Sequence, residues 1–114
     1  MGGFVEFPKV VKLKQKFDST KVKDIPKTIS EELQSSNVCT LLKPGDSVAI
    51  TAGSRGVTNI ATIIRSLVFE LKKRGARPFI IPAMGSHGGG TAEGQLNVLQ
   101  HYGITDNSMG VPSR

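Results

Sequence analysis

The chain has 114 residues, of which 38% are hydrophobic and 21% are charged, a composition typical of one small globular domain. It contains no run of about 18 apolar residues that would cross a membrane, and its amino terminus lacks the basic and apolar regions of a signal peptide. We therefore expect a cytoplasmic protein with no membrane partner. The single cysteine, Cys39, excludes an internal disulfide and is predicted to be a small buried hydrophobic residue.

The net charge of +6 at pH 7 is concentrated near the amino terminus, where residues 9–27 hold seven lysines and two aspartates. Apolar and polar residues roughly alternate from Val11 to Phe17, which is typical of a half-buried strand with a lysine face in solvent. Lysine also discourages an edge strand from pairing with other chains, and no arginine lies among these lysines to contact bases. We therefore expect residues 1–23 to form a basic amino-terminal strand, and we do not favour nucleic-acid binding.

Residues 24–46 predict a helix that is followed by a turn. Asp24 or Thr28 is expected to cap the helix, and the segment from Thr28 to Glu31 fits the capping-box pattern. Four apolar residues share one face at helical spacing, namely Val22, Ile25, Ile29 and Leu33. Pro44-Gly45 then predicts a turn, because proline fixes one backbone dihedral angle and glycine frees the next.

A strand, helix, strand unit is predicted between residues 47 and 83. The apolar run over residues 47–51 suits a buried strand. The helix after it has one apolar stripe, made of Ile60, Ile63, Ile64, Leu67, Val68 and Leu71. Thr58 or Asn59 is expected to cap this helix and Gly75 to end it. Residues 77–83 are predicted to form the second strand, and because parallel crossovers are right-handed, both strands end at the same edge.

The remaining residues predict a glycine-rich loop over residues 85–90 and then a helix. Thr91 is expected to cap this helix and Gly103 to end it, with Ala92, Leu96, Leu99 and Tyr102 facing inward. Residues 105–114 add no further complete element. The sequence thus predicts an α/β fold, a Rossmann-like open sheet with a parallel β-α-β-α core over residues 24–114. Two or three strands are few for such a sheet, so we expect a truncated fragment of a larger two-domain enzyme.

Two loops carry residues suited to chemistry, and each follows a predicted parallel strand at the edge where open α/β sheets bind ligands. In the first loop, Gly53-Ser54-Arg55-Gly56, the glycines let backbone amides approach a ligand, and Arg55 offers a planar fork for a phosphate or carboxylate. An ordinary turn with a solvated arginine is the alternative.

In the second loop, His87 lies among four glycines and off any apolar stripe. Its imidazole can take or give a proton at neutral pH, whereas a flexible surface histidine is the alternative. The glycines fit neither the dinucleotide-binding motif nor the P-loop motif. Ser54 and Ser86 lack the context of a nucleophile and are interpreted as ligand-facing hydroxyls. His101 is expected only to meet the last carbonyl groups of its helix.

Together, residues 53–56, 70–75 and 82–95 resemble the amino-terminal domain of the nickel-dependent lactate racemase family. The likeness runs from about Gly45 to about Gly110, and the histidine loop is its most specific part. It implies a racemase or epimerase of 2-hydroxy acids that uses a nickel-pincer nucleotide, which accepts and returns a hydride. His87 is then the proton-transfer histidine of the first domain, and Arg55 holds the cofactor phosphate or the substrate carboxylate.

The same resemblance implies that five further residues contact cofactor or substrate, namely Gly53, Ser54, Ser86, Gly88 and Gly89. The cofactor-tethering lysine, the nickel-binding histidine and the second catalytic histidine of the family lie downstream of residue 114. We therefore expect no metal ligand here, an inactive isolated chain, and two partners: a small 2-hydroxy acid and the remaining carboxy-terminal domain.

The chain departs from the lactate racemase pattern in both loops. The racemase has an aspartate and a proline near the arginine and an arginine after the histidine, where this chain has Gly56 and Gly88. This difference favours another hydroxy acid as the substrate. The alternative function is a noncatalytic α/β module that binds an anionic metabolite or a protein partner through the two loops.

Overall fold

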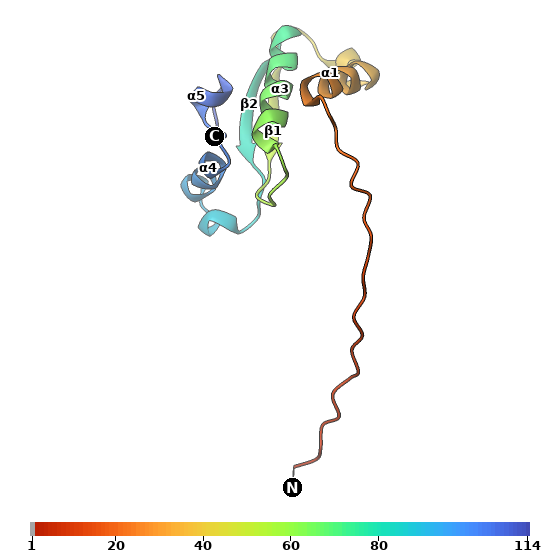
Figure 1. Ribbon diagram of the computed structural model, residues 1–114. Coiled ribbons are helices and arrows are strands. Elements are labelled where there is room, and N and C mark those ends of the chain that lie inside the picture. Colours follow the sequence, from red (N-terminus) through yellow and green to blue (C-terminus); the bar gives the residue numbers. More distant parts are fainter. Residues whose placement is uncertain (1) are drawn as a thin grey trace.

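The computed structural model describes residues 2–114 and shows a small α/β domain with a two-stranded parallel sheet and an extended amino-terminal segment (Figure 1). The predicted α/β class is therefore confirmed. In chain order the elements are α1 (Ile25–Ser35), α2 (Val38–Leu41), β1 (Ser47–Ala52), α3 (Ile60–Lys73), β2 (Arg77–Pro82), the 3₁₀ turn η1 (His87–Gly90), α4 (Ala92–His101) and α5 (Asp106–Met109). Within residues 2–114, every helix is too short or too polar to span a membrane.

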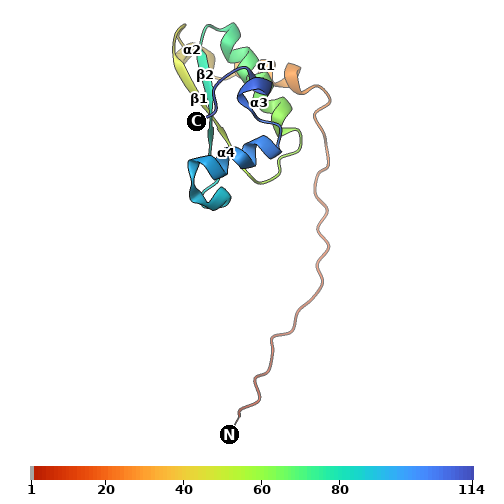
Figure 2. The same cartoon turned by 90° about the vertical axis from the view of Figure 1, so that its left-hand side faces the viewer.

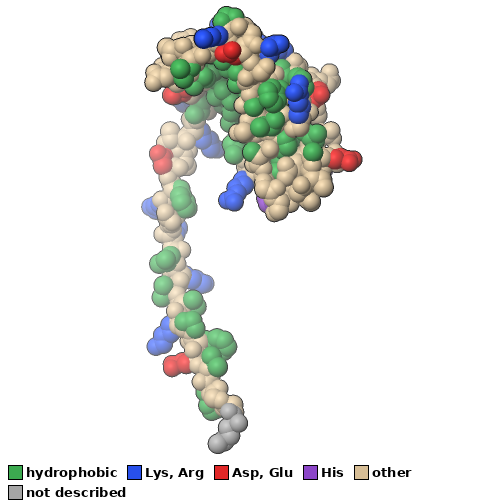
Figure 3. Space-filling view, turned by 180° about the vertical axis from the view of Figure 1, so that it is seen from behind, with side chains coloured by type: hydrophobic (Ala, Val, Ile, Leu, Met, Phe, Trp, Pro, Cys, Tyr) green, Lys and Arg blue, Asp and Glu red, His purple; other side chains and the backbone are tan. Residues whose placement is uncertain are grey.

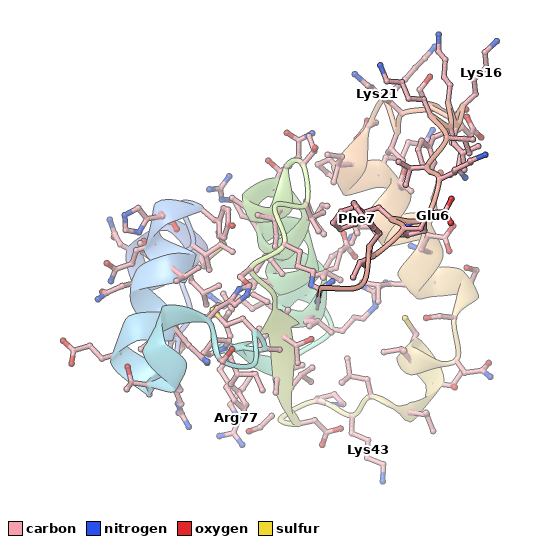
Figure 4. The ribbon with its side chains drawn as sticks, turned by 90° about the horizontal axis from the view of Figure 1, so that it is seen from below. Glu6, Phe7, Lys16, Lys21, Lys43 and Arg77 are labelled. Carbon is pink, nitrogen blue, oxygen red and sulfur yellow. The ribbon has the colours of Figure 1, made fainter. Side chains whose placement is uncertain are left out.

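The strand predicted over residues 1–23 is wrong for residues 2–22, which form neither helix nor strand, while Met1 lies outside the described residues. This segment runs away from the domain in both ribbon views (Figures 1 and 2). Its apolar and lysine side chains are uncovered in Figure 3, and Lys16 and Lys21 point outward in Figure 4. An alternating pattern sets which side chains share a face, but a strand also needs a hydrogen-bonded neighbour. No strand of the described residues pairs with this segment.

The first helix, α1, begins at its N-cap Asp24, whose carboxylate accepts a hydrogen bond from the Lys27 N–H at 3.0 Å. The Thr28 hydroxyl instead donates to the Asp24 carbonyl oxygen at 2.8 Å, so the cap is Asp24 and not Thr28. The helix packs on α3. Three of the four residues on the predicted apolar face are half-buried, namely Ile25, Ile29 and Leu33.

The sheet confirms the predicted strand, helix, strand unit. β1 and β2 run parallel, in register from Ser47 opposite Arg77 to the last residues of both strands. The crossover helix α3 ends before Gly75, which has φ 83° and so adopts the left-handed conformation expected there. The expected side-chain cap is missing, because Asn59 stands at the N-cap with φ 61° and its side chain makes no capping hydrogen bond.

The second crossover helix, α4, begins at Thr91, whose hydroxyl accepts a hydrogen bond from the Gly94 N–H at 3.1 Å. This cap and the positive φ of 78° at Gly103 agree with the prediction. Leu99 is fully buried, whereas Ala92 is exposed and was wrongly predicted to face inward. Ala92 is the first residue of the helix and precedes the turn that contacts the core.

The end of the chain starts to extend the sheet beyond β2. The Ile80 N–H donates to the Pro112 carbonyl at 2.9 Å, and the Arg114 N–H donates to the Ile80 carbonyl at 2.9 Å. These bonds place Ser113 in a parallel bridge with Ile80. The sequence predicts no further complete element over residues 105–114. The structure adds two small features there, the one-turn helix α5 and this bridge.

The core lies on one face of the sheet. In β1, Ile50 and Ala52 are buried, whereas residues 47, 49 and 51 are exposed. Side chains of α3 and α4 share this core, among them Val68 and Leu99, so both helices lie on the same face of the sheet. Figure 2 shows α1 and α3 together on one side of the strands. The most deeply buried side chains of this core are Ile80, Leu99 and Ile104.

A largely buried ion pair between Glu70 and Arg74 lies at the end of α3. The Arg74 Nη1 atom lies 2.6 Å from Glu70 Oε2, and the Glu70 side chain is only 8% exposed. This hydrogen bond holds the pKa of Glu70 below its ordinary value and raises the pKa of Arg74. Nearby, the Cys39 thiol donates to the Leu33 carbonyl oxygen at 2.7 Å and is half-buried, where the sequence predicts full burial.

Candidate functional site

The loops that follow β1 and β2 meet at one edge of the sheet. The strands end side by side, and the Ala83 N–H continues their ladder by donating to the Ala52 carbonyl at 2.8 Å. Beyond this bond the first loop carries Ser54 and Arg55, and the second carries His87. Parallel pairing of neighbouring strands therefore brings together residues that are more than thirty positions apart, as the sequence predicts.

A pocket of about 500 Å³ lies between the two loops. Five of the seven predicted site residues line this pocket, namely Gly53, Ser54, Arg55, Ser86 and His87. The other lining residues are Val57, Ala83, Met84 and Gly85. Met84 is a buried apolar residue of this lining, whereas Arg55 and His87 are exposed. The two remaining predicted residues, Gly88 and Gly89, do not line this pocket.

A hydrogen bond joins the two loops across the pocket. It runs between the Ser54 hydroxyl and His87 Nδ1. Ser54 is itself held from α4, because the Tyr102 hydroxyl donates to the Ser54 carbonyl oxygen at 2.8 Å. The His87 N–H donates to the Met84 carbonyl at 3.2 Å, which fixes the start of the 3₁₀ turn. The imidazole thus has a defined hydrogen-bond partner in the first loop.

Gly88 has a packing role where the sequence suggests contact with a ligand. Its φ is +64°, and a Cβ atom placed there would lie 2.5 Å from the backbone carbon of Gly94 and 2.6 Å from the Gln95 nitrogen. A Cβ atom on Gly94 would in turn collide with the Gly88 carbonyl oxygen. The histidine loop therefore packs directly onto the first turn of α4, and both glycines are needed for that approach.

Two residues that stabilise the histidine loop were not predicted. Gln95 donates from Nε2 to the Gly85 carbonyl at 2.7 Å, and Gly94 permits the close contact with Gly88. A glycine inside a predicted helix is a signal of close backbone approach and was available for Gly94. No comparable signal exists for Gln95, since its partner is a backbone carbonyl ten residues away. Gly89 has φ +70° and open space around it, so its left-handed backbone conformation, and not packing, favours glycine at this position.

Arg55 is the only cationic side chain in the lining of this pocket, apart from the histidine. Within residues 2–114 it makes no hydrogen bond or ion pair, and its guanidinium is therefore available to an anion. By contrast, His101 Nδ1 lies 2.7 Å from the Asn97 carbonyl oxygen, four residues earlier in α4. This contact agrees with the helix-end role expected for His101 and leaves His87 as the histidine of the site.

The described residues do not supply a metal site. Among residues 2–114, no group of three or more histidine, cysteine, aspartate or glutamate side chains is arranged to hold a metal ion. The lining of the pocket offers one imidazole, that of His87, and one guanidinium, that of Arg55. These two groups suit the recognition of a small anion beside a proton-transfer group.

A second hollow, of about 480 Å³, lies between the end of the amino-terminal segment, α1 and the start of α3. Its lining is mainly apolar and includes Val22, Ile25 and Ile63, with Lys21 as its one charged residue. It contains no histidine, aspartate or glutamate among its lining residues.

Compared with known proteins, the chain matches no family model, no characterised protein and no solved structure. The interpretation of the pocket therefore depends on its geometry and on the sequence motifs.

Proposed function

We propose that the pocket between the two loops binds a small 2-hydroxy acid, and that the chain is the amino-terminal part of a lactate racemase-like racemase or epimerase. The observation that supports this function is the convergence of Arg55 and His87 on one pocket at the carboxyl edge of the parallel strands. A guanidinium fork matches a carboxylate, and an imidazole nearby matches the hydroxyl group on the adjacent carbon.

In this proposal Arg55 binds the substrate and His87 transfers a proton. Arg55 holds the carboxylate and so fixes the position of the α carbon relative to His87. The imidazole takes the hydroxyl proton while the bond between the α carbon and its hydrogen is broken, and it returns the proton when the hydrogen is restored. Holding acid, base and substrate in one geometry supplies much of the acceleration of such a reaction.

The nickel-pincer nucleotide of the proposed enzyme family accepts and returns the hydride when it is bound. In this proposal the chain itself contributes carboxylate binding through Arg55 and proton transfer through His87. The start of a third parallel strand at Ser113 supports the related proposal that the sheet belongs to a larger Rossmann-like domain. That proposal includes a carboxy-terminal domain with the other catalytic groups and a cytoplasmic location.

Binding of a 2-hydroxy acid tests the first part of the proposal. Titration of the ¹⁵N-labelled chain with sodium L-lactate should shift the amide signals of residues 53–57 and 83–87 and few others. Arg55→Ala should abolish these shifts, because the carboxylate loses its charged partner. Lys43→Ala is the matched control, since it removes the same charge near the opposite end of β1 and should leave binding unchanged. Equal binding by both variants would contradict the assignment of Arg55.

Turnover tests the second part. We expect the 114-residue chain to racemise no 2-hydroxy acid even when the pincer nucleotide is added, and a longer protein that contains it to racemise at least one. In that longer protein, His87→Asn should abolish turnover and leave L-lactate binding intact. Unchanged turnover would instead support the noncatalytic anion-binding module.

A further inference from the structure

Ser54 is bonded to the histidine and lines the pocket that a ligand would occupy. Its hydroxyl is hydrogen-bonded to His87 Nδ1, and the same side chain lines the pocket beside Arg55. The Tyr102 hydroxyl donates to the Ser54 carbonyl oxygen at 2.8 Å and so holds this part of the loop in place. Ser54 can therefore contact the imidazole and a bound anion at the same time.

The direction of the bond between Ser54 and His87 decides what the histidine can do. A neutral imidazole carries one N–H, and a serine hydroxyl has one proton to donate. If Ser54 donates to Nδ1, the imidazole proton lies on Nε2, and that nitrogen cannot accept another. If Nδ1–H donates to Ser54, Nε2 is unprotonated and can act as a base.

We propose that a bound carboxylate sets this direction and thereby makes His87 a base only when the pocket is occupied. The proposal rests on the proposed function, that is, on binding of a 2-hydroxy acid in this pocket. A carboxylate is acceptor-only, so the Ser54 hydroxyl turns and donates to it. The Ser54 oxygen then accepts from Nδ1–H, which favours the tautomer with a free Nε2.

The proton count balances without any further reactant. One proton leaves Nε2 for water, and one proton from water binds Nδ1, so the imidazole is neutral before and after. The serine proton is not transferred, because it exchanges one acceptor, Nδ1, for another, the carboxylate oxygen. Ser54 is thus a positioning residue. Its change of acceptor produces a basic Nε2 on His87 only when a substrate hydroxyl is nearby.

The test is the ¹⁵N spectrum of the histidine side chains, recorded at a pH where both imidazoles are neutral. His101 is an internal reference, because its Nδ1 faces the Asn97 carbonyl, which only accepts, and must carry the proton. Without ligand, the His87 signals should show the proton mainly on Nε2. With saturating sodium L-lactate, they should move to the Nδ1–H pattern that His101 shows throughout.

Two variants separate positioning from folding. Ser54→Ala should still bind L-lactate through Arg55, but the tautomer of His87 should no longer change on binding. Ser54→Thr keeps the hydroxyl and should restore the change. A wild-type His87 that binds L-lactate with no change of tautomer would overturn the coupling and leave the proposed function standing. Absence of binding by L-lactate and by larger 2-hydroxy acids would overturn both.

Discussion

The contact between Gly88 and α4 makes a quantitative prediction about stability. In Gly88→Ala the new Cβ atom would lie 2.5 Å from the Gly94 backbone carbon, and neither backbone segment can move away as a flexible side chain would. The substitution adds two costs: about 1–2 kcal/mol for a left-handed residue with a Cβ atom and about 1–3 kcal/mol for overpacking. We expect the free energy of unfolding to fall by roughly 2–5 kcal/mol in total.

Gly89→Ala is the matched control for this prediction. Gly89 has φ +70°, close to the +64° of Gly88, but a Cβ atom there would meet nothing within 4 Å. Only the left-handed cost remains, and the loss should be about 1–2 kcal/mol. Urea denaturation followed by circular dichroism measures both variants, and the difference between them isolates the contact with α4. Equal destabilisation by the two substitutions would refute the close approach of the histidine loop to Gly94.

Three further predictions address the supports of the domain and of the site. Tyr102→Phe removes the hydrogen bond to the Ser54 carbonyl but keeps the ring, and should lower the free energy of unfolding by about 1 kcal/mol in urea denaturation; no loss would show that the bond contributes nothing. The pKa of Glu70 is lowered in the folded state by Arg74, so its stabilising contribution is full above the ordinary glutamate pKa and is lost as pH falls through the lowered value. Glu70→Gln should therefore flatten the acid side of a plot of unfolding free energy against pH, and an unchanged slope would contradict the pairing. Deletion of residues 2–17, whose large apolar side chains are at least 77% exposed, should change the unfolding free energy by less than about 0.5 kcal/mol. A larger loss would mean that the segment packs on the domain.

Local patterns predicted the elements well because they depend on neighbours along the chain. β1 and β2 lie within one residue of their predicted ranges, and Thr91 and Gly103 bound α4 as expected. The edge where the two loops meet also followed from the sequence, since adjacent parallel strands must end together. The amino-terminal strand failed for the opposite reason, because strand formation depends on a partner that an alternating pattern does not specify.

The details of the site depend on contacts between elements, and these were less predictable. Ser54 and Ser86 were both interpreted as ligand-facing hydroxyls, and only the fold shows that Ser54 is also bonded to His87. Tyr102 was predicted to face inward, but its bond to the Ser54 carbonyl joins α4 to the first loop. Gly88 lies six positions from Gly94 and was interpreted as part of a ligand site, because the turn that folds one back onto the other is not evident from composition.

The bridge at Ser113 has a consequence for how the most deeply buried strand residue exchanges its amide hydrogen. Ile80 has no exposed side-chain surface, yet its N–H donates to Pro112, near the end of the chain, and to no residue of β1. Burial of the side chain alone therefore does not protect this amide. In heavy water, deuterium should enter at Ile80 in proportion to the fraction of time that residues 112–114 are detached from β2, and that single amide reports on the docking of the chain's end.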